Sequence, residues 1–184
     1  MLVRDVKRAP SPSRRPSSPA SVLPVAAAGS LAKRVGGIDV NKLLRILPQR
    51  PPALMLDRVV ELDPRKSARG IKCVSANEPA VRGHFPSAPV LPAVLCLEAL
   101  SQLMCVLIYA SDGLDPSYQQ YCLAGIEKAK FRQPVLPGDR LELTIRVLHH
   151  RSNIWKCSGT AMVDDILCVE AELLAAVQDC EELD

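Results

Sequence analysis

Aromatic side chains are scarce in this sequence, whose 184 residues include one Trp, three Tyr and two Phe. Hydrophobic residues nevertheless make up 48% of the chain, and its mean hydropathy is close to zero, at +0.09. A chain of this length and composition has room for one domain with a substantial core. Because aromatics are few, aliphatic side chains must fill that core.

An uninterrupted apolar run of membrane-spanning length is also missing. The longest apolar stretch covers residues 90–110 and is broken by Pro92, Glu98, Ser101 and Gln102. A spanning helix needs about 20 consecutive, mostly apolar residues. We therefore expect a buried helix in this stretch and no transmembrane segment.

The sequence contains no C-x-x-C pair, although it has seven cysteines at positions 73, 96, 105, 122, 157, 168 and 180. Most lie among apolar neighbours, as small core residues do. This usage favours a reducing compartment, and hence the cytoplasm, over secretion. Cys and His do not cluster at metal-ligand spacing either, since His149 and His150 would point to opposite faces of an expected strand. We expect no bound metal.

The first 37 residues differ from the rest in charge and composition. They hold seven Lys or Arg and one acid, whereas the remainder holds sixteen basic and nineteen acidic residues. Because this segment is rich in Ser, Pro, Ala and Arg and lacks apolar periodicity, we expect a disordered basic tail. The composition also suits a plastid or mitochondrial transit peptide, although five prolines argue against a continuous amphipathic helix. An unstructured extension is the simpler interpretation, and the folded domain is expected over residues 38–180.

Local patterns in that domain predict several strands and one long helix. A short helix capped by Asp39 and ended by Pro48 precedes them. Strands are predicted over residues 53–62, 68–76, 120–131, 140–150, 153–163 and 166–178, from β-branched content and partial alternation. The long helix is predicted over residues 93–110. These elements indicate an α+β domain in which an antiparallel sheet wraps around one nearly all-apolar helix.

One carboxylate and one histidine contrast with this apolar pattern. Glu98 lies inside the long helix, and helical spacing places Gln102 within hydrogen-bonding reach of it. A buried carboxylate is costly unless it has a partner or a chemical use. His84 lies fourteen residues earlier, in a loop rich in Gly and Pro, and an imidazole can accept a proton near neutral pH.

Together, His84 and Glu98 would form a proton-transfer pair in an apolar cleft. Such a pair suits removal of a proton alpha to a carbonyl and departure of a hydroxyl. In the structural alternative, Glu98 completes a buried hydrogen-bond network and His84 holds its turn. That alternative is favoured for either residue taken alone, but the pair is more informative than its members.

The stretch that carries this pair, GHFPSAPVLPAVLCLEALSQ at residues 83–102, resembles the signature of the FabZ-type β-hydroxyacyl-acyl-carrier-protein dehydratases. In that family, GHFP and a downstream PGV-x-x-x-EA-x-x-Q are diagnostic. The resemblance continues in order through LLRILPQRPPALMLDRVVEL, VSANEPAVRGHFP, YCLAGIEKAKFRQPVLPGDRL and IWKCSGTAMVDD, and covers about residues 39–178. It implies a hot-dog fold, in which the sheet curls around the long helix.

The resemblance also implies an activity and partners. The activity is reversible elimination of water from a (3R)-hydroxyacyl thioester on acyl carrier protein, giving the trans-2-enoyl thioester, in fatty-acid or related acyl-chain biosynthesis. The family needs no cofactor for it. Its active sites lie at a dimer interface, with the histidine and the glutamate of one site on different subunits. A homodimer is therefore expected, and a trimer of dimers is left open.

The resemblance assigns roles to individual residues. His84 matches the catalytic base, and Glu98 matches the partner carboxyl that orients water or protonates the leaving hydroxyl. The matching substrate-binding positions are Gly83, Phe85, Ala93, Val94 and Gln102.

Ala93 marks the main departure from the family pattern. The family's PGV is Pro92-Ala93-Val94 here, and the family's glycine amide binds the thioester carbonyl oxygen. Ala93 keeps an N–H at the same helix end. If the position required a positive φ, alanine would cost about 1–2 kcal/mol. Smaller residues than usual at Ala53 and Ala80 leave the acyl chain-length preference open.

A row of basic residues suggests where an acidic carrier protein would dock. Lys128, Lys130 and Arg132 would share one face of the expected strand, and Arg82 lies beside the histidine loop. Such a row can attract carboxylates and speed encounter. An ordinary solvated strand face is the equal alternative. Interleaved aromatics of a nucleic-acid platform are missing, so no nucleic-acid partner is expected.

Two other functions fit parts of the sequence. A hot-dog thioesterase would hydrolyse the thioester, but the presence of both His84 and Glu98 at dehydratase spacing argues against it. A non-catalytic paralogue that binds acyl carrier protein would explain Ala93 and the missing aromatics. It would not need both members of the pair.

Overall fold

The computed structural model describes residues 37–116 and 118–179. A disordered tail or a transit peptide was predicted over residues 1–37. Apart from Gly37, these residues lie outside the described ranges. The described residues all fall in one unit, residues 35–184.

The described helices and strands reproduce the predicted order, with one addition. In chain order they are α1 (Val40–Ile46), β1 (Arg58–Asp63), β2 (Ser67–Cys73), α2 (Pro79–Arg82), α3 (Ala93–Asp112), β3 (Gln119–Phe131), β4 (Arg140–Arg151), β5 (Ile154–Val163) and β6 (Ile166–Asp179). The predicted cap of the first helix is confirmed, because the Asp39 carboxylate accepts from the Lys42 N–H at 3.0 Å. The addition is α2, a single turn that starts at Pro79, the residue type most suited to a first helical position.

The first strand begins later than its sequence pattern predicts. Residues 53–57 were expected to be extended within the sheet, but Ala53 and Leu54 close a turn onto the Arg50 carbonyl. Met55 and Leu56 are buried in the core although they precede β1. Met55 and Leu56 are therefore apolar because they pack in the core, and they do not form part of the sheet.

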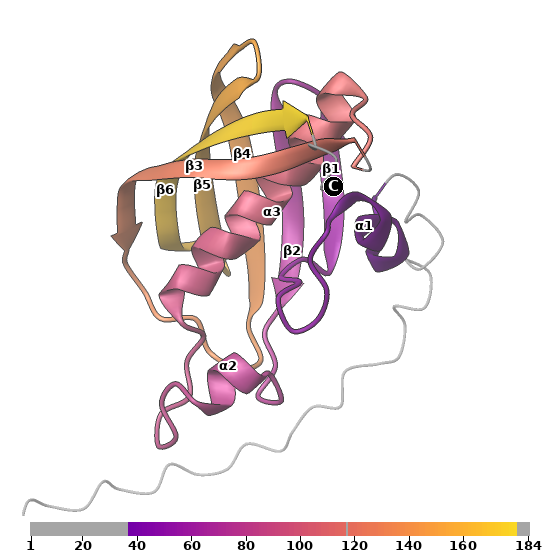
Figure 1. Cartoon of the computed structure of the whole chain (residues 1–184). Coiled ribbons are helices and arrows are strands. Elements are labelled where there is room, and N and C mark those ends of the chain that lie inside the picture. Colours follow the sequence, from indigo (N-terminus) through magenta and orange to yellow (C-terminus); the bar gives the residue numbers. More distant parts are fainter. Residues whose placement is uncertain (1–36, 117, 180–184) are drawn as a thin grey trace, which may run out of the picture. The chain divides into compact units, whose positions relative to one another are not determined.

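The six strands form one antiparallel sheet in the order β1-β2-β4-β5-β6-β3. Figure 1 shows this sheet curving around α3. Along β4, Leu141, Leu143 and Ile145 alternate with less buried residues and point inward. The predicted hot-dog arrangement, an antiparallel sheet wrapped around one long helix, is confirmed.

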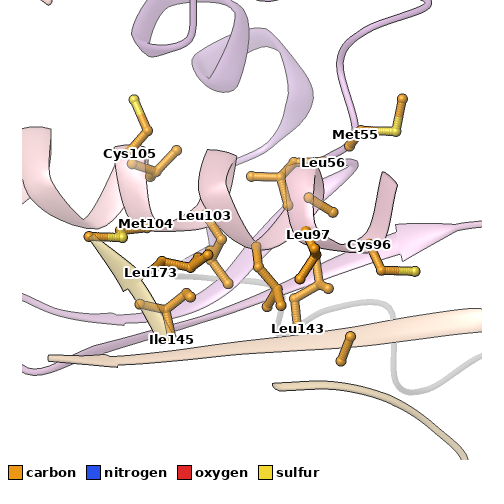
Figure 2. Packing of buried hydrophobic residues seen from close by; sticks show 14 of the residues in the cluster. Met55, Leu56, Cys96, Leu97, Leu103, Met104, Cys105, Leu143, Ile145 and Leu173 are labelled. Atoms are coloured by element: carbon orange, nitrogen blue, oxygen red, sulfur yellow. The ribbon is translucent and has the colours of Figure 1, made fainter. Parts of the chain in front are cut away.

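The helix α3 lies very close to the sheet. A side chain added at Gly159 would meet the side chain of Leu100 at 3.2 Å, and one added at Gly70 would meet Leu103 at 3.1 Å. Figure 2 shows the aliphatic packing between Leu97 and Leu103 of α3 and the strands below. As the scarcity of aromatics requires, aliphatic side chains make up most of this core.

The length and composition of α3 alone would suit a membrane span, but 72% of its apolar window is buried within the domain. It therefore has the character of a core helix. It ends at Gly113, which adopts the left-handed conformation (φ 64°) and donates its N–H to the Tyr109 carbonyl. From Cys96 to Tyr109, every residue of α3 is buried except Glu98.

Candidate active site

His84 lies in the turn that follows α2. Its N–H donates to the Val81 carbonyl at 3.1 Å, and its own carbonyl accepts from the Val90 N–H at 2.9 Å. Val81 is fully buried and anchors the turn in the core. The imidazole is half-buried and stacks on the neighbouring Phe85 ring, with 4.1 Å between ring centroids. The peptide bond between these two residues is cis.

Glu98 is held by a buried glutamine one turn later. The Gln102 Nε2 donates to Glu98 Oε1 at 2.7 Å and to the Ala53 carbonyl at 2.8 Å. Its Oε1 accepts from the Met55 N–H at 2.8 Å. The predicted hydrogen bond between Glu98 and Gln102 is therefore confirmed. The sequence did not indicate that the same amide would also fasten the segment before β1.

Replacing Gln102 with leucine is expected to lower the free energy of unfolding by roughly 1–3 kcal/mol, because the buried Met55 N–H would lose its acceptor and the Ala53 carbonyl its donor. Urea unfolding would measure the loss. The matched control is Gln120→Leu, at an exposed glutamine of β3, for which a change within about 0.5 kcal/mol is expected. Equal losses in the two variants would contradict the bridging role.

The turn that carries His84 leads directly into the N-terminus of α3, where Glu98 lies in the second turn (Figure 1). Among the residues that the structure describes, no hydrogen bond or ion pair joins His84 to Glu98. Large apolar side chains next to each are exposed, namely Phe85 (56%) and Val94 (62%). The two groups are thus at the same end of the domain without forming a pair within one chain.

Ala93 is the first residue of α3 and follows the N-cap Pro92. It is not among the described residues with positive φ, so the conditional strain of an alanine at this position does not arise. The Leu95 N–H bonds to the Pro92 carbonyl at 2.9 Å. The Ala93 and Val94 N–H groups have no acceptor within the described part of the chain, as is usual for the first turn of a helix. They can donate to a ligand oxygen.

A family model described as the FabA-like domain matches residues 47–172, which include His84, Glu98 and all six strands except the end of β6. The chain belongs to the FabA-like domain family. It is 52% identical over 144 residues to a 3-hydroxyacyl-[acyl-carrier-protein] dehydratase FabZ of Sorangium cellulosum, covering 78% of this chain and 93% of that one. It is 47% identical over 142 residues to the FabZ protein of Myxococcus xanthus, covering 77% and 93%.

The fold of this FabA-like domain also matches solved structures. One is the dehydratase heterocomplex ApeI:P from Xenorhabdus doucetiae, with a TM-score of 0.60 and 15% identity over 76% of this chain and 91% of that one. At this identity the likeness concerns the fold alone.

A second polar pair lies near Glu98 in the FabA-like domain. The hydroxyls of Ser101 and Tyr121 are 2.9 Å apart, and burial raises the pKa of the Tyr121 hydroxyl. The Tyr109 hydroxyl donates to the Gln119 carbonyl at 2.6 Å, which ties the start of β3 to α3. Ser101 was not predicted to have a role, although a polar residue three positions after Glu98 on an apolar helix was a signal.

The basic row on β3 of the FabA-like domain faces carboxylates. The ion pairs are Lys128–Glu172 (2.6 Å), Lys130–Glu170 (3.5 Å), Arg132–Glu170 (2.6 Å), Lys156–Glu127 (2.8 Å) and Lys156–Glu172 (2.9 Å). Hydrogen bonds from Lys128 and Lys156 hold the pKa of the Glu172 carboxyl below its ordinary value. The three predicted residues do point to one face, despite a bulge at Lys128 (φ 52°). Their pairing across strands favours a solvated strand face over a docking surface.

Proposed function

We propose that this chain is a (3R)-hydroxyacyl-[acyl-carrier-protein] dehydratase, a hydro-lyase that reversibly removes water from 3-hydroxyacyl thioesters in fatty-acid or related acyl-chain biosynthesis. The observation that carries the proposal is Glu98, the one incompletely buried residue between Cys96 and Tyr109 of α3, held by Gln102. Such a carboxyl is available to a ligand and fixed in orientation. Relatives at 42–52% identity that are named FabZ dehydratases support the same reaction.

In the proposed reaction, the His84 imidazole removes a proton from C2 of the acyl chain. The electron pair forms the C2=C3 double bond as the C3–OH bond breaks, and the Glu98 carboxyl donates the proton with which the hydroxyl leaves as water. The Ala93 N–H, at the positive end of the α3 dipole, stabilises the charge that develops on the thioester oxygen. Hydration of the enoyl thioester is the same path in reverse.

A homodimer with shared sites is part of the proposal. β3 is an edge strand of the sheet, and its described part exposes Leu123, Ile126 and Phe131. An exposed apolar edge favours association with another chain. Pairing of two copies would cover this edge and let His84 of one copy serve Glu98 of the other. This would account for the absence of a direct contact between them in one described chain.

Acyl carrier protein is the proposed partner, and Arg82 is its proposed contact. Arg82 is exposed in the last turn of α2, two residues before His84, so a carrier held there would present its acyl chain to the histidine. The paired row of Lys128, Lys130 and Arg132 is a weaker candidate. The described cysteines are all free, which suits the cytoplasmic location expected from the sequence.

The direct test is incubation of the purified protein with crotonoyl- and longer enoyl-acyl-carrier substrates. Loss of the enoyl absorbance reports hydration, and a thiol reagent in a parallel reaction reports thioester hydrolysis. Hydration without thiol release supports the dehydratase. Thiol release alone would make the protein a thioesterase, and no reaction at any chain length would favour a non-catalytic carrier-binding protein.

The oxyanion role of Ala93 has a test of its own. Proline at the first position of a helix is well tolerated, and Pro92 already has the extended conformation that a following proline requires (ψ 124°). Ala93→Pro should therefore remove the N–H but leave α3 intact, and lower kcat by about 10²–10³-fold. The control is Ala93→Gly, which keeps the N–H and should leave kcat within about threefold of the wild type. Equal rates for all three proteins would exclude this donor.

A further inference from the structure

Lys72, at the end of β2, is the only charged residue that is buried in the described part of the chain. Its side chain is 7% exposed, and its Nζ donates to Glu78 Oε1 at 2.9 Å. A weaker bond reaches the Cys73 carbonyl at 3.4 Å. No step of the proposed reaction uses this ammonium group, so its burial needs another explanation.

Glu78 is fixed by two donors. Besides Lys72, the Ser75 N–H donates to the same Oε1 at 3.0 Å. Taking an ammonium and a carboxylate out of water is costly, and a hydrophobic pair of the same size is often equally stable. A retained buried pair is therefore better explained by the geometry it specifies than by the stability it adds.

The Lys72–Glu78 pair fixes the position of α2 and of the turn after it, which carries His84. Glu78 is the N-cap residue of α2, and its carbonyl accepts from the Val81 and Arg82 N–H groups, both at 3.1 Å. The Val81 carbonyl in turn accepts from the His84 N–H at 3.1 Å. A helix of four residues cannot hold itself in place, so its position depends on such anchors.

The same residues form one wall of a cavity of about 680 Å³. Lys72, Glu78 and Ala80 lie on this wall, and the segment that contains Met55 lines the cavity as well. Met55 is bonded to Gln102, which holds Glu98. Polar contacts thus lead from this cavity to both members of the proposed catalytic pair.

We propose that Lys72 is a positioning residue of the dehydratase: its buried pair with Glu78 fixes α2 and thereby the backbone from which the His84 imidazole projects. The inference rests on the proposed function. Because a misplacement of about 1 Å can lower a rate 10²-fold, Lys72→Met and Glu78→Gln should each lower kcat by about 10- to 100-fold. KM should change by less than about threefold, since neither side chain binds substrate. Lys72→Arg keeps the charge and should recover most of the rate.

The matched control is Asp112→Asn, at the other end of α3. Asp112 pairs with Arg65 at 2.8 Å, and its side chain is 21% exposed, against 22% for Glu78. This variant breaks an ion pair with an equally exposed carboxylate and should leave kcat unchanged. Because its cation, Arg65, is 64% exposed and Lys72 only 7%, it should lower the melting temperature less than Glu78→Gln does. All rates are taken per folded protein, measured by circular dichroism.

A spectroscopic readout separates positioning from loss of stability. In protein labelled with ¹⁵N-histidine, the His84 ring resonances, assigned with His84→Ala, should shift in Lys72→Met and stay in place in Asp112→Asn. Unchanged kcat and unchanged His84 resonances in folded Lys72→Met would overturn the inference. A wild-type protein that hydrates no enoyl substrate would instead overturn the proposed function, and the resonance shift would still decide whether Lys72 positions His84.

Discussion

His84→Ala is expected to lower kcat for enoyl hydration by about 10³-fold or more, because it removes the group that transfers the proton at C2. The change should cost little stability. The imidazole is only half-buried, and its one ring contact is the stack on Phe85. Loss of enoyl absorbance measures the rate, and a thermal melt followed by circular dichroism checks the fold.

The control for this variant is His149→Ala, which makes the same substitution at an exposed position on β4. It should hydrate the substrate as fast as the wild type. Full activity in His84→Ala would rule out the proposed base. Hydration lost but thiol release retained would move the chain from the dehydratases to the thioesterases, since hydrolysis needs no proton transfer at C2.

The long helix and most strands of this fold could be predicted because the spacing of apolar residues along the sequence matches the spacing of buried positions in a helix or strand. The first half of β4, from Leu141 to Ile145, buries alternate residues, and the long helix is apolar on nearly every side because the sheet curves around it (Figure 1). By contrast, α2 is too short to show a period. Residues 53–57 matched a strand pattern although Met55 and Leu56 are buried without joining the sheet, because an apolar pattern reports burial and not strand pairing.

In the candidate site too, contacts between residues close in the sequence could be predicted, and contacts between distant residues could not. The bond from Gln102 to Glu98 spans four residues and follows from helix geometry. The bond from Gln102 to Met55 joins residues 47 positions apart, which only the folded chain brings together. Lys72 was missed because a lysine in a strand is typical of a solvent-facing position. The partners of Lys128 and Lys130 could have been foreseen, since Glu172 and Glu170 alternate on the strand that pairs with β3.

Mixing two inactive variants should restore activity if each site takes His84 from one subunit and Glu98 from the other. Glu98→Ala alone should lower kcat by about 10²–10⁴-fold, as loss of a general acid does. In a dimer of one His84→Ala and one Glu98→Ala chain, one site carries both changes and the other carries neither. Co-expression in equal amounts should give roughly a quarter of the wild-type activity, because about half of the dimers are mixed and each mixed dimer has one intact site of two.

The design requires that chains pair during synthesis and that mixed dimers can be isolated. Different affinity tags on the two variants allow sequential purification, after which the mixed dimer should show about half of the wild-type rate. The control co-expresses two differently tagged His84→Ala chains, which should stay inactive. A mixed dimer no more active than this control would mean that both groups act within one subunit. In that case His84 and Glu98 of one chain would act on different atoms of the same substrate, which requires no hydrogen bond between them.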